Sequence, residues 1–364
     1  MNHRLSTLLA SKSFTANATE VIDITLKEPI SEILINHQVL NGAAASMTEH
    51  PIACITKVEL VDGSDVLFSL SGPQIDAVDW YELKRTRSPW KVALNGNYTD
   101  QYICLHFGRF LWDPLMAFVP TKFKNPQLKI TLDIDAGGQT PTTNKLEVYA
   151  AVFDEKIIEP IGFLMHKEVK DYAMGSATHE YTDLPTDYPY RKLFIRQKTL
   201  GTEPNSVLSH IKLSEEFDKK VVFDHDANIL ANILCCQAPP YEEHWLYAVQ
   251  TAQKYIMCTP TTRCAGVGAE WTETAAAALS ISIYDGDGGR LKVIGSTGCN
   301  AQIFVRGWLP HGVWEIPFGE PFDPDDLYDV TKLDNLRLDL LSASGRSSSD
   351  SVQIFLQQLR TYPA

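Results

Sequence analysis

Basic residues are scarce in this chain. Its 364 residues include 32 Lys and Arg against 45 Asp and Glu, which gives a formal net charge of −13 at pH 7. An acidic surface repels the phosphates of nucleic acids, so we do not expect the chain to wrap or package nucleic acid directly. With 44% hydrophobic and 21% charged residues, the composition is that of a folded globular chain long enough for two domains.

Long apolar runs are also missing. The first ten residues, MNHRLSTLLA, hold too few apolar side chains for the core of a signal peptide. No later stretch approaches the length that crosses a bilayer. We therefore expect a soluble protein made without a secretion signal.

The cysteines follow no pairing or metal-binding pattern. Their number is odd, and the spacing of Cys258 and Cys264 matches no zinc motif. Cys235 and Cys236 are adjacent, which prevents comfortable chelation of one ion. Several cysteines lie in apolar runs, so buried free thiols in a reducing cytoplasm are the expected state. The seven are Cys54, Cys104, Cys235, Cys236, Cys258, Cys264 and Cys299.

Motifs of known catalytic chemistry are absent. The chain has no G-x-S-x-G elbow, no phosphate-binding glycine loop and no His-x-His with a spaced Glu. Residues 284–289, YDGDGG, resemble part of a calcium loop but lack its distal Glu, so a hairpin turn is the better interpretation.

Two short clusters combine imidazole with carboxylate, and each could supply a metal ligand or an acid–base pair. Asp224-His225-Asp226 lies at a predicted helix start, where Asp is expected as a cap. Glu242-Glu243-His244 lies in a polar stretch, where charges are normally solvated. We therefore predict no catalytic residue, no cofactor and no metal site.

Short alternating strands dominate what is present. Residues 55–60 and 66–70 flank an Asp62-Gly63 step, which is a strong hairpin signal. The segment Ser71-Gly72-Pro73 then predicts the start of a short helix, with Ile75, Val78 and Tyr81 on one side. Many short strands between Gly, Pro and Asn turns favour an antiparallel sandwich. Further strands are expected at 20–26, 33–35, 102–107, 128–134 and 146–150.

The second half of the chain repeats the first. Residues 208–213 and 221–223 repeat the pattern of the hairpin strands, and Asp224 or Asp226 caps a following helix that has an apolar face. The same order of elements in both halves predicts a duplicated sandwich. Later matches pair 307–310 with 108–110, 336–341 with 128–134, and 352–355 with 146–149.

These patterns give the expected boundaries. The spacing of apolar residues predicts a helix over 159–172, and the polar stretch 175–189 predicts a linker. Leu5, Leu8 and Leu9 are at partly helical spacing, although a disordered terminus explains that segment equally well. The segments are a first sandwich at 19–158, a connector at 159–189 and a second sandwich at 190–364.

The halves differ in length at one place. Val78 and Gly108 are 30 residues apart, whereas Ile233 and Gly307 are 74 apart. The excess predicts a loop insertion at 238–299, which includes a hairpin of 279–283 and 291–294. Long excursions from a rigid scaffold usually carry surface contacts.

The tryptophans are the remaining candidates for a binding surface. They could line a sugar-binding face, but most lie beside apolar runs, so packing in the core or at a subunit contact is favoured. They include Trp80, Trp90, Trp112, Trp271, Trp308 and Trp314.

Taken together, the halves resemble the double jelly-roll major capsid proteins of tailless icosahedral viruses and phages. The first half contributes residues 55–80, with the Asp62-Gly63 hairpin and the Gly72-Pro73 helix. The C-terminal part carries much of the resemblance, in residues 307–312, 315–319, 327–331, 336–338 and 352–362.

The resemblance implies an all-β fold of two tandem antiparallel jelly-roll sandwiches with short helices. It implies a structural protein, not an enzyme, that trimerises into pseudo-hexameric capsomers of an icosahedral shell. The insertion would form an outward tower. Residues 1–18 would form an N-terminal arm that lies inside, near a lipid membrane or neighbouring capsomers. Minor capsid and vertex proteins are further implied partners. The protein would be made in the host cytoplasm and act in the virion.

Two other classes remain open from the residues alone. One is a glycan-cleaving hydrolase or amidase on tandem jelly rolls, which needs carboxylates that converge in a cleft. The other is a carbohydrate-binding or adhesive module. The lack of a secretion signal counts against both.

Overall fold

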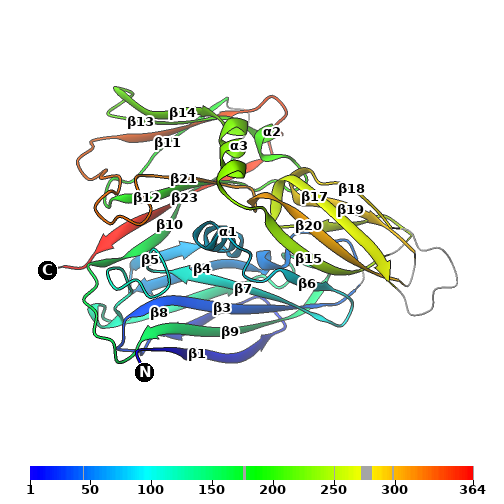
Figure 1. The fold of residues 1–364 in the computed structure, drawn as a ribbon, viewed down its shortest axis with the longest axis horizontal. Coiled ribbons are helices and arrows are strands. Elements are labelled where there is room, and N and C mark those ends of the chain that lie inside the picture. Colours follow the sequence, from blue (N-terminus) through cyan, green and yellow to red (C-terminus); the bar gives the residue numbers. More distant parts are fainter. Residues whose placement is uncertain (44, 175–177, 250, 272–280, 297–298, 364) are drawn as a thin grey trace.

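Two β-sandwiches and a smaller β body make up the protein (Figure 1). The computed structural model describes residues 1–363 except 44, 175–177, 250, 272–280 and 297–298, and it leaves the side chains of 270–271 undescribed. No helix in the described part of the chain is long and apolar enough to span a membrane.

The first sandwich consists of two four-stranded layers. Sheet 1a has the order β1-β9-β3-β7, and sheet 1b is the half β2-β8-β4-β5 of an eight-stranded sheet that continues into the second sandwich. All their pairings are antiparallel. The strands of sheet 1a are β1 (His3–Phe14), β9 (Pro141–Phe153), β3 (Ile30–Asn41) and β7 (Tyr98–His106). Those of sheet 1b are β2 (Ala18–Asp23), β8 (Pro126–Leu132), β4 (Ile55–Asp62) and β5 (Asp65–Leu70).

The second sandwich has the same topology, strand for strand. Sheet 2a has the order β10-β23-β12-β21 and sheet 2b the order β11-β22-β13-β14, so the predicted duplication is confirmed. Sheet 2a consists of β10 (Gly162–Ala173), β23 (Ser351–Thr361), β12 (Tyr190–Gln197) and β21 (Val313–Pro317). Sheet 2b consists of β11 (His179–Asp183), β22 (Leu336–Ser342), β13 (Leu208–Glu215) and β14 (Lys220–Asp226).

A helix follows the same hairpin in both halves, as predicted. Helix α1 (Gly72–Leu83) follows β5, and helix α3 (Ala227–Gln237) follows β14. The predicted cap is present in α3, where the Asp226 carboxylate accepts from the amides of Asn228 and Ile229 at 2.8 and 3.1 Å. Short helical turns complete the element list: α2 (Pro204–Val207), η1 (Pro51–Cys54), η2 (Pro120–Lys122) and η3 (Asp287–Gly289).

The predicted helix over 159–172 is wrong, because that segment is strand β10. Residues 162–166 are buried on both faces of the sheet, so they form a continuous apolar run without the alternation of a half-exposed strand. Strand β10 pairs with β23 along its length and, in parallel, with β5 through Phe68 opposite His166. Because β11 lies at 179–183, the predicted linker also holds a strand, and the second sandwich begins at β10.

The predicted arm at 1–18 also contains a strand. Strand β1 pairs with β9 at the edge of sheet 1a, in neither a helical nor a free conformation. The register shifts between Thr7 and Leu9 and between Leu9 and Lys12. Such bulges break the period of two, which explains why the leucines seem to follow helical spacing.

The insertion folds as a separate β body, which we call the tower (residues 90–93 and 241–310). One of its sheets has the order β17-β20-β15-β6, and the other has the order β16-β19-β18. Strand β6 comes from the first half and pairs in parallel with β15. The strands are β6 (Trp90–Ala93), β15 (Tyr241–Ala248), β16 (Lys254–Met257), β17 (Pro260–Trp271), β18 (Ser282–Asp285), β19 (Arg290–Ile294) and β20 (Asn300–Pro310).

The predicted hairpin of the insertion is confirmed where the structure describes it. Strands β18 and β19 pair from Ser282 opposite Ile294, and residues 286–289 form the turn between them. Asp285 makes an ion pair with Lys292 at 2.6 Å, so its carboxylate has a partner within the hairpin. Residues 279–280 of the predicted first strand lie outside the described part.

The cores follow the same division. One continuous apolar cluster runs through both sandwiches and includes Ile33, Val58, Ile195 and Leu213, while the tower has its own cluster around Trp245. All seven cysteines are free thiols. The predicted burial is confirmed for Cys54, Cys104 and Cys258, whereas Cys236 is exposed and the other three are half-buried.

The placement of β1 in the sandwich can be tested by its core contact. Phe14 is 8% exposed and belongs to the main core, whereas Leu5 in the same strand is 61% exposed. We expect Phe14→Ala to lower the free energy of unfolding by about 3 kcal/mol or more, and Leu5→Ala by less than about 0.5 kcal/mol. Urea unfolding measures both. Equal, negligible effects would mean that residues 1–14 are a free arm.

Candidate functional site

Helix α1 lies between the two sandwiches (Figure 1). Residues 72–81 are all buried, so the helix lacks the single apolar side predicted from Ile75, Val78 and Tyr81. At its first turn, the Gln74 side chain accepts from the Ser71 amide and donates to Glu168 of β10, each at 2.7 Å. Near its last turn, the Tyr81 hydroxyl donates to the Val313 carbonyl of β21 at 2.6 Å. The helix is therefore bonded to sheet 2a at both ends.

A buried ion-pair network strengthens this joint. Glu82 of α1 lies 2.7 Å from the Arg191 guanidinium and 2.9 Å from the Lys192 ammonium, both on β12. Lys192 also pairs with Glu315 of β21 at 2.6 Å. Burial opposes ionisation of Glu82, but the two cations hold its pKa well below the usual range. The joint is therefore ionic and fixed in geometry.

A second buried network joins α1 to the tower. Asp76 accepts from the Tyr241 hydroxyl at 3.2 Å and contacts His311 Nε2 at 2.8 Å. Beside it, Glu243 of β15 lies 3.2 Å from His50 and accepts from Trp245 Nε1 at 3.0 Å. These contacts fix the tower relative to α1 and the first sandwich.

The prediction that the Glu242-Glu243-His244 charges are solvated is wrong for Glu243, which is fully buried. Alternation along β15 turns Glu243 inward and leaves Glu242 and His244 on the outer face. Burial raises the pKa of Glu243, but His50 and its other partners lower it to about 2. Since Glu242 and Glu243 point to opposite faces, they do not form the facing pair that glycoside hydrolysis requires.

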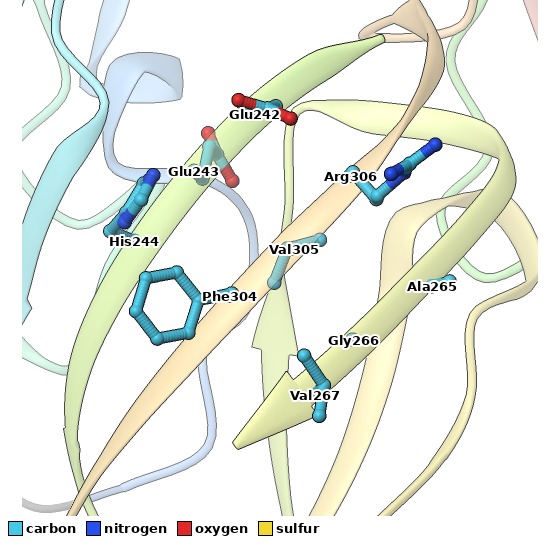
Figure 2. Close-up of a pocket in the computed structure, with 9 residues that line it drawn as sticks. All are labelled: Glu242, Glu243, His244, Ala265, Gly266, Val267, Phe304, Val305 and Arg306. Atoms are coloured by element: carbon cyan, nitrogen blue, oxygen red, sulfur yellow. The ribbon is translucent and has the colours of Figure 1, made fainter. Parts of the chain in front are cut away.

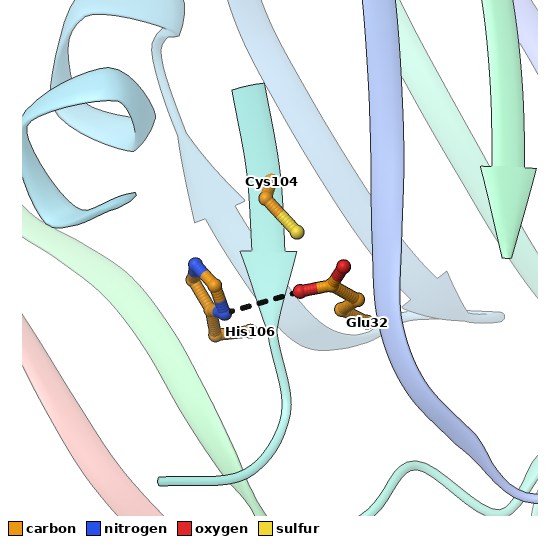
Figure 3. A group of neighbouring side chains, drawn as sticks. All are labelled: Glu32, Cys104 and His106. Carbon is orange, nitrogen blue, oxygen red and sulfur yellow. Dashed lines mark ion pairs between the residues drawn. The ribbon is translucent and has the colours of Figure 1, made fainter. Parts of the chain in front are cut away.

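Glu32, Cys104 and His106 form a third cluster (Figure 3), on strands β3 and β7. Burial alone would lower the pKa of His106, but Asp79 at 2.7 Å from Nε2 raises it, which favours the imidazolium. Burial also raises the pKa of the Cys104 thiol. An imidazolium and a thiol are poor metal ligands, and Arg87 forms two bonds of 2.7 and 2.9 Å with Asp79. The cluster is best described as an ion-pair network.

The outer face of the tower sheet carries an apolar row. Trp90, His244, Phe304 and Val267 lie directly opposite one another on its four strands. Trp90 is 64% exposed and Val267 68% exposed. A pocket of about 210 Å³ lies on this face between β15, β20 and β17 (Figure 2).

The other predicted positions have structural roles. Asp226 caps α3, while His225 is exposed on β14. Trp80 and Trp314 are buried, which confirms the packing interpretation for them, whereas Trp90 is the exception. Trp112 and Trp308 are half-buried, and the side chain of Trp271 lies outside the described residues.

Comparison with known proteins gives a match at the level of fold. No protein-family model matches the chain, and neither does any curated protein. The STIV major capsid protein superimposes with a TM-score of 0.61 and 12% identity, over 99% of this chain and 97% of that one. For PBCV-1 VP54 the TM-score is 0.59 with 11% identity, over 98% and 93%.

The major capsid protein P2 of bacteriophage PM2 superimposes with a TM-score of 0.53 and 10% identity, over 99% and 98% of the two chains. The chain has the double jelly-roll fold. Both jelly rolls are matched along the length of these proteins, which confirms the fold class predicted from the duplicated strand pattern. The interaction that sequence analysis missed is the joint around α1, in which Glu82 is more than 100 residues from its partners Arg191 and Lys192 in the chain.

The buried joint predicts that removal of the Glu82 carboxylate strongly lowers the free energy of unfolding. Glu82→Ala leaves the Arg191 and Lys192 cations buried without one of their carboxylates, so we expect the free energy of unfolding to fall by about 3–5 kcal/mol. The exposed Glu159→Ala is the matched control and is expected to stay within about 0.5 kcal/mol of wild type. Chemical denaturation followed by fluorescence measures both. A loss below about 1 kcal/mol for Glu82→Ala would contradict an ionic joint.

The contact between Asp76 of α1 and His311, which follows the last strand of the tower, predicts acid sensitivity. Burial, helped by the nearby His50 and Arg196, lowers the pKa of His311 to about 4 against the opposing effect of Asp76. A histidine with a lowered folded pKa stabilises fully above its unfolded pKa of about 6.5 and loses this as pH falls toward 4.

Between pH 7 and 5 this histidine alone accounts for a loss of about 2 kcal/mol. We therefore expect His311→Gln to lose less stability over that range than wild type does. The exposed His225→Gln is the control. Urea unfolding at a series of pH values is the measurement, and identical curves for His311→Gln and wild type would refute the assignment.

Proposed function

We propose that this protein is the major capsid protein of an icosahedral virus, a structural protein whose homotrimers form pseudo-hexameric capsomers. The observation that carries the proposal is the superposition of nearly the whole chain on nearly the whole length of three capsid proteins. The match covers two jelly rolls in tandem. It is therefore a likeness to double jelly-roll proteins and more than a likeness to single jelly rolls in general.

The buried joint supports the same function. Two jelly rolls fixed by α1 form one rigid unit that presents two similar walls, and three such units close a ring of six. A closed ring of identical copies needs a subunit that holds its internal angle, because a flexible hinge would allow open chains. The networks of Glu82 and Asp76 give α1 that rigidity.

The positions of the tower and the termini suggest which end of the subunit faces outward in the shell. The tower lies at one end of the sandwiches, and both termini lie toward the other end (Figure 1). We propose that the tower faces outward and that the termini face the interior, toward neighbouring capsomers, minor capsid proteins or an internal membrane. The net charge of −13 opposes direct contact with the genome. The protein would then act in the virion, without a catalytic role.

Native mass spectrometry of the purified chain tests this proposal. We expect a species of three times 40.7 kDa at micromolar concentration. Negative-stain electron microscopy should then show hexagonal particles, sheets or shells. A stable monomer that cleaves or binds glycans on an array of oligosaccharides would contradict the capsid function and favour a carbohydrate-active protein.

A further inference from the structure

The two jelly rolls are equivalent, but only one of their two capping helices is covered. Helix α1 is buried between its own roll and sheet 2a. Helix α3 caps the second roll in the same position, yet Ile229 is 53% exposed, Ile233 is 42% exposed and Cys236 is exposed. The second helix therefore presents an open apolar face.

Counting from the N-cap residues Ser71 and Asp226 shows what the open face corresponds to. Ile229 matches Gln74, and Cys236 matches Tyr81. In α1 these two positions contact sheet 2a, through the bonds of Gln74 to β10 and of Tyr81 to β21. Ile229 and Cys236, both exposed in α3, thus occupy the positions that contact the next jelly roll in α1.

The composition of α3 is that of a covered helix. Residues 227–237, ANILANILCCQ, carry no charged side chain, whereas a helix that faces solvent normally has charges on its outer side. Covering this face buries no charge and leaves no ion without a partner. Since the chain has a net charge of −13, an uncharged face is where two copies can approach with least repulsion.

The edge strands of the sheets show the same difference, since one pair of edges is joined within the chain and the equivalent pair is open. Within the chain, β5 of the first roll pairs in parallel with β10 of the second, through Ser69 opposite Lys167. The equivalent strands at the two outer ends of the molecule are β14 and β1, and each is the last strand of its sheet in the described part of the chain. One copy thus offers an open β14 edge where another offers an open β1 edge.

A matching face lies on sheet 1a. In sheet 2a, Phe194 and Phe355 are opposite each other, stack at 4.9 Å and are fully buried at the joint. The equivalent pair in sheet 1a, Leu34 and Tyr149, is only half-buried, as is Tyr102 nearby. This face of sheet 1a is therefore open where its counterpart is covered.

The alignment of the two faces is supported by their hydrogen bonds. Arg196 donates to Gln353 at 3.0 Å in sheet 2a, one position beyond the phenylalanine pair on that face. Asn36 donates to Glu147 at 3.2 Å in the corresponding place in sheet 1a. Both sheets thus place a hydrogen-bonded polar pair next to a pair of large apolar or aromatic residues, although the residue types differ.

We infer that subunits join head to tail, with α3 of one copy packed on sheet 1a of the next and β14 beside β1. This contact repeats between chains the joint that α1, β5 and sheet 2a form within one chain. The inference rests on the proposed function, since it names the faces by which the trimer closes. A contact between two different faces propagates around a ring, so three copies can close with every face used.

The test uses one variant for each face of the full-length chain. The tail variant is Ile229→Glu with Ile233→Glu, and both sites are exposed, so the monomer is expected to fold. The head variant is Tyr149→Lys, in which the new ammonium can replace the bond from Tyr149 to Glu147. The control is Ile157→Glu at a residue that is 92% exposed. Native mass spectrometry reads the oligomeric state of each.

Each variant alone is expected to be monomeric, while the control stays trimeric like wild type. A mixture of tail and head variants should give heterodimers without trimers, because each partner retains one intact face. Tail variants that remain trimeric, or mixtures that form no dimer, would overturn the inference and leave the proposed function standing. A wild-type chain that never forms a trimer would instead contradict the proposed function itself.

A second measurement does not depend on the charged variants. Cys236 is exposed in the single chain and would be covered in the trimer. Its labelling by a maleimide, read by peptide mass spectrometry, should be at least about tenfold slower in the wild-type trimer than in the monomeric head variant, which keeps α3 unchanged. Equal rates would overturn the inference.

Discussion

Helix α1 carries three carboxylates into the space between two sandwiches, and each must meet a cation or a donor there for the helix to be buried. Asp76 meets Tyr241 and His311, Asp79 meets Arg87 and His106, and Glu82 meets Arg191 and Lys192. Asp79 is satisfied within the first half of the chain, but an unpaired buried carboxylate costs several kcal/mol, so the second jelly roll and the tower can take only positions that supply the partners of Glu82 and Asp76. The relative orientation of all three bodies follows from this requirement.

The same constraint explains why the second half differs from the first. Helix α3 caps an equivalent roll but carries no charge, so nothing within the chain must come to meet it. Its apolar face is left for another molecule, whereas α1 is committed to its own chain. Two copies of one domain have thus acquired an internal joint that is ionic and an external face that is apolar. The ionic joint suits an interaction within one chain that never opens. The apolar face suits a contact that must form between separate subunits.

The sequence predicts the duplication because the hairpins repeat: Asp62-Gly63 and the capping residue Asp226 lie where the strand pattern requires them. It does not predict β1 or β10, since bulges in the first and burial on both faces of the second remove the period of two. Strand and helix patterns could not predict the joint, because Glu82 and Arg191 are 109 residues apart and only the fold brings them together. The one available signal was the spacing of three acids on an otherwise apolar helix.

The central claim is that the trimer repeats between chains the joint that α1 forms within one. A cryo-EM map of the purified oligomer, at a resolution that traces the backbone, tests this most directly. We expect six jelly rolls in a ring, in which α3 lies on sheet 1a of the next subunit as α1 lies on sheet 2a of its own chain (Figure 1). A trimer whose α3 faces solvent, or whose rolls do not alternate around a ring, would contradict the account.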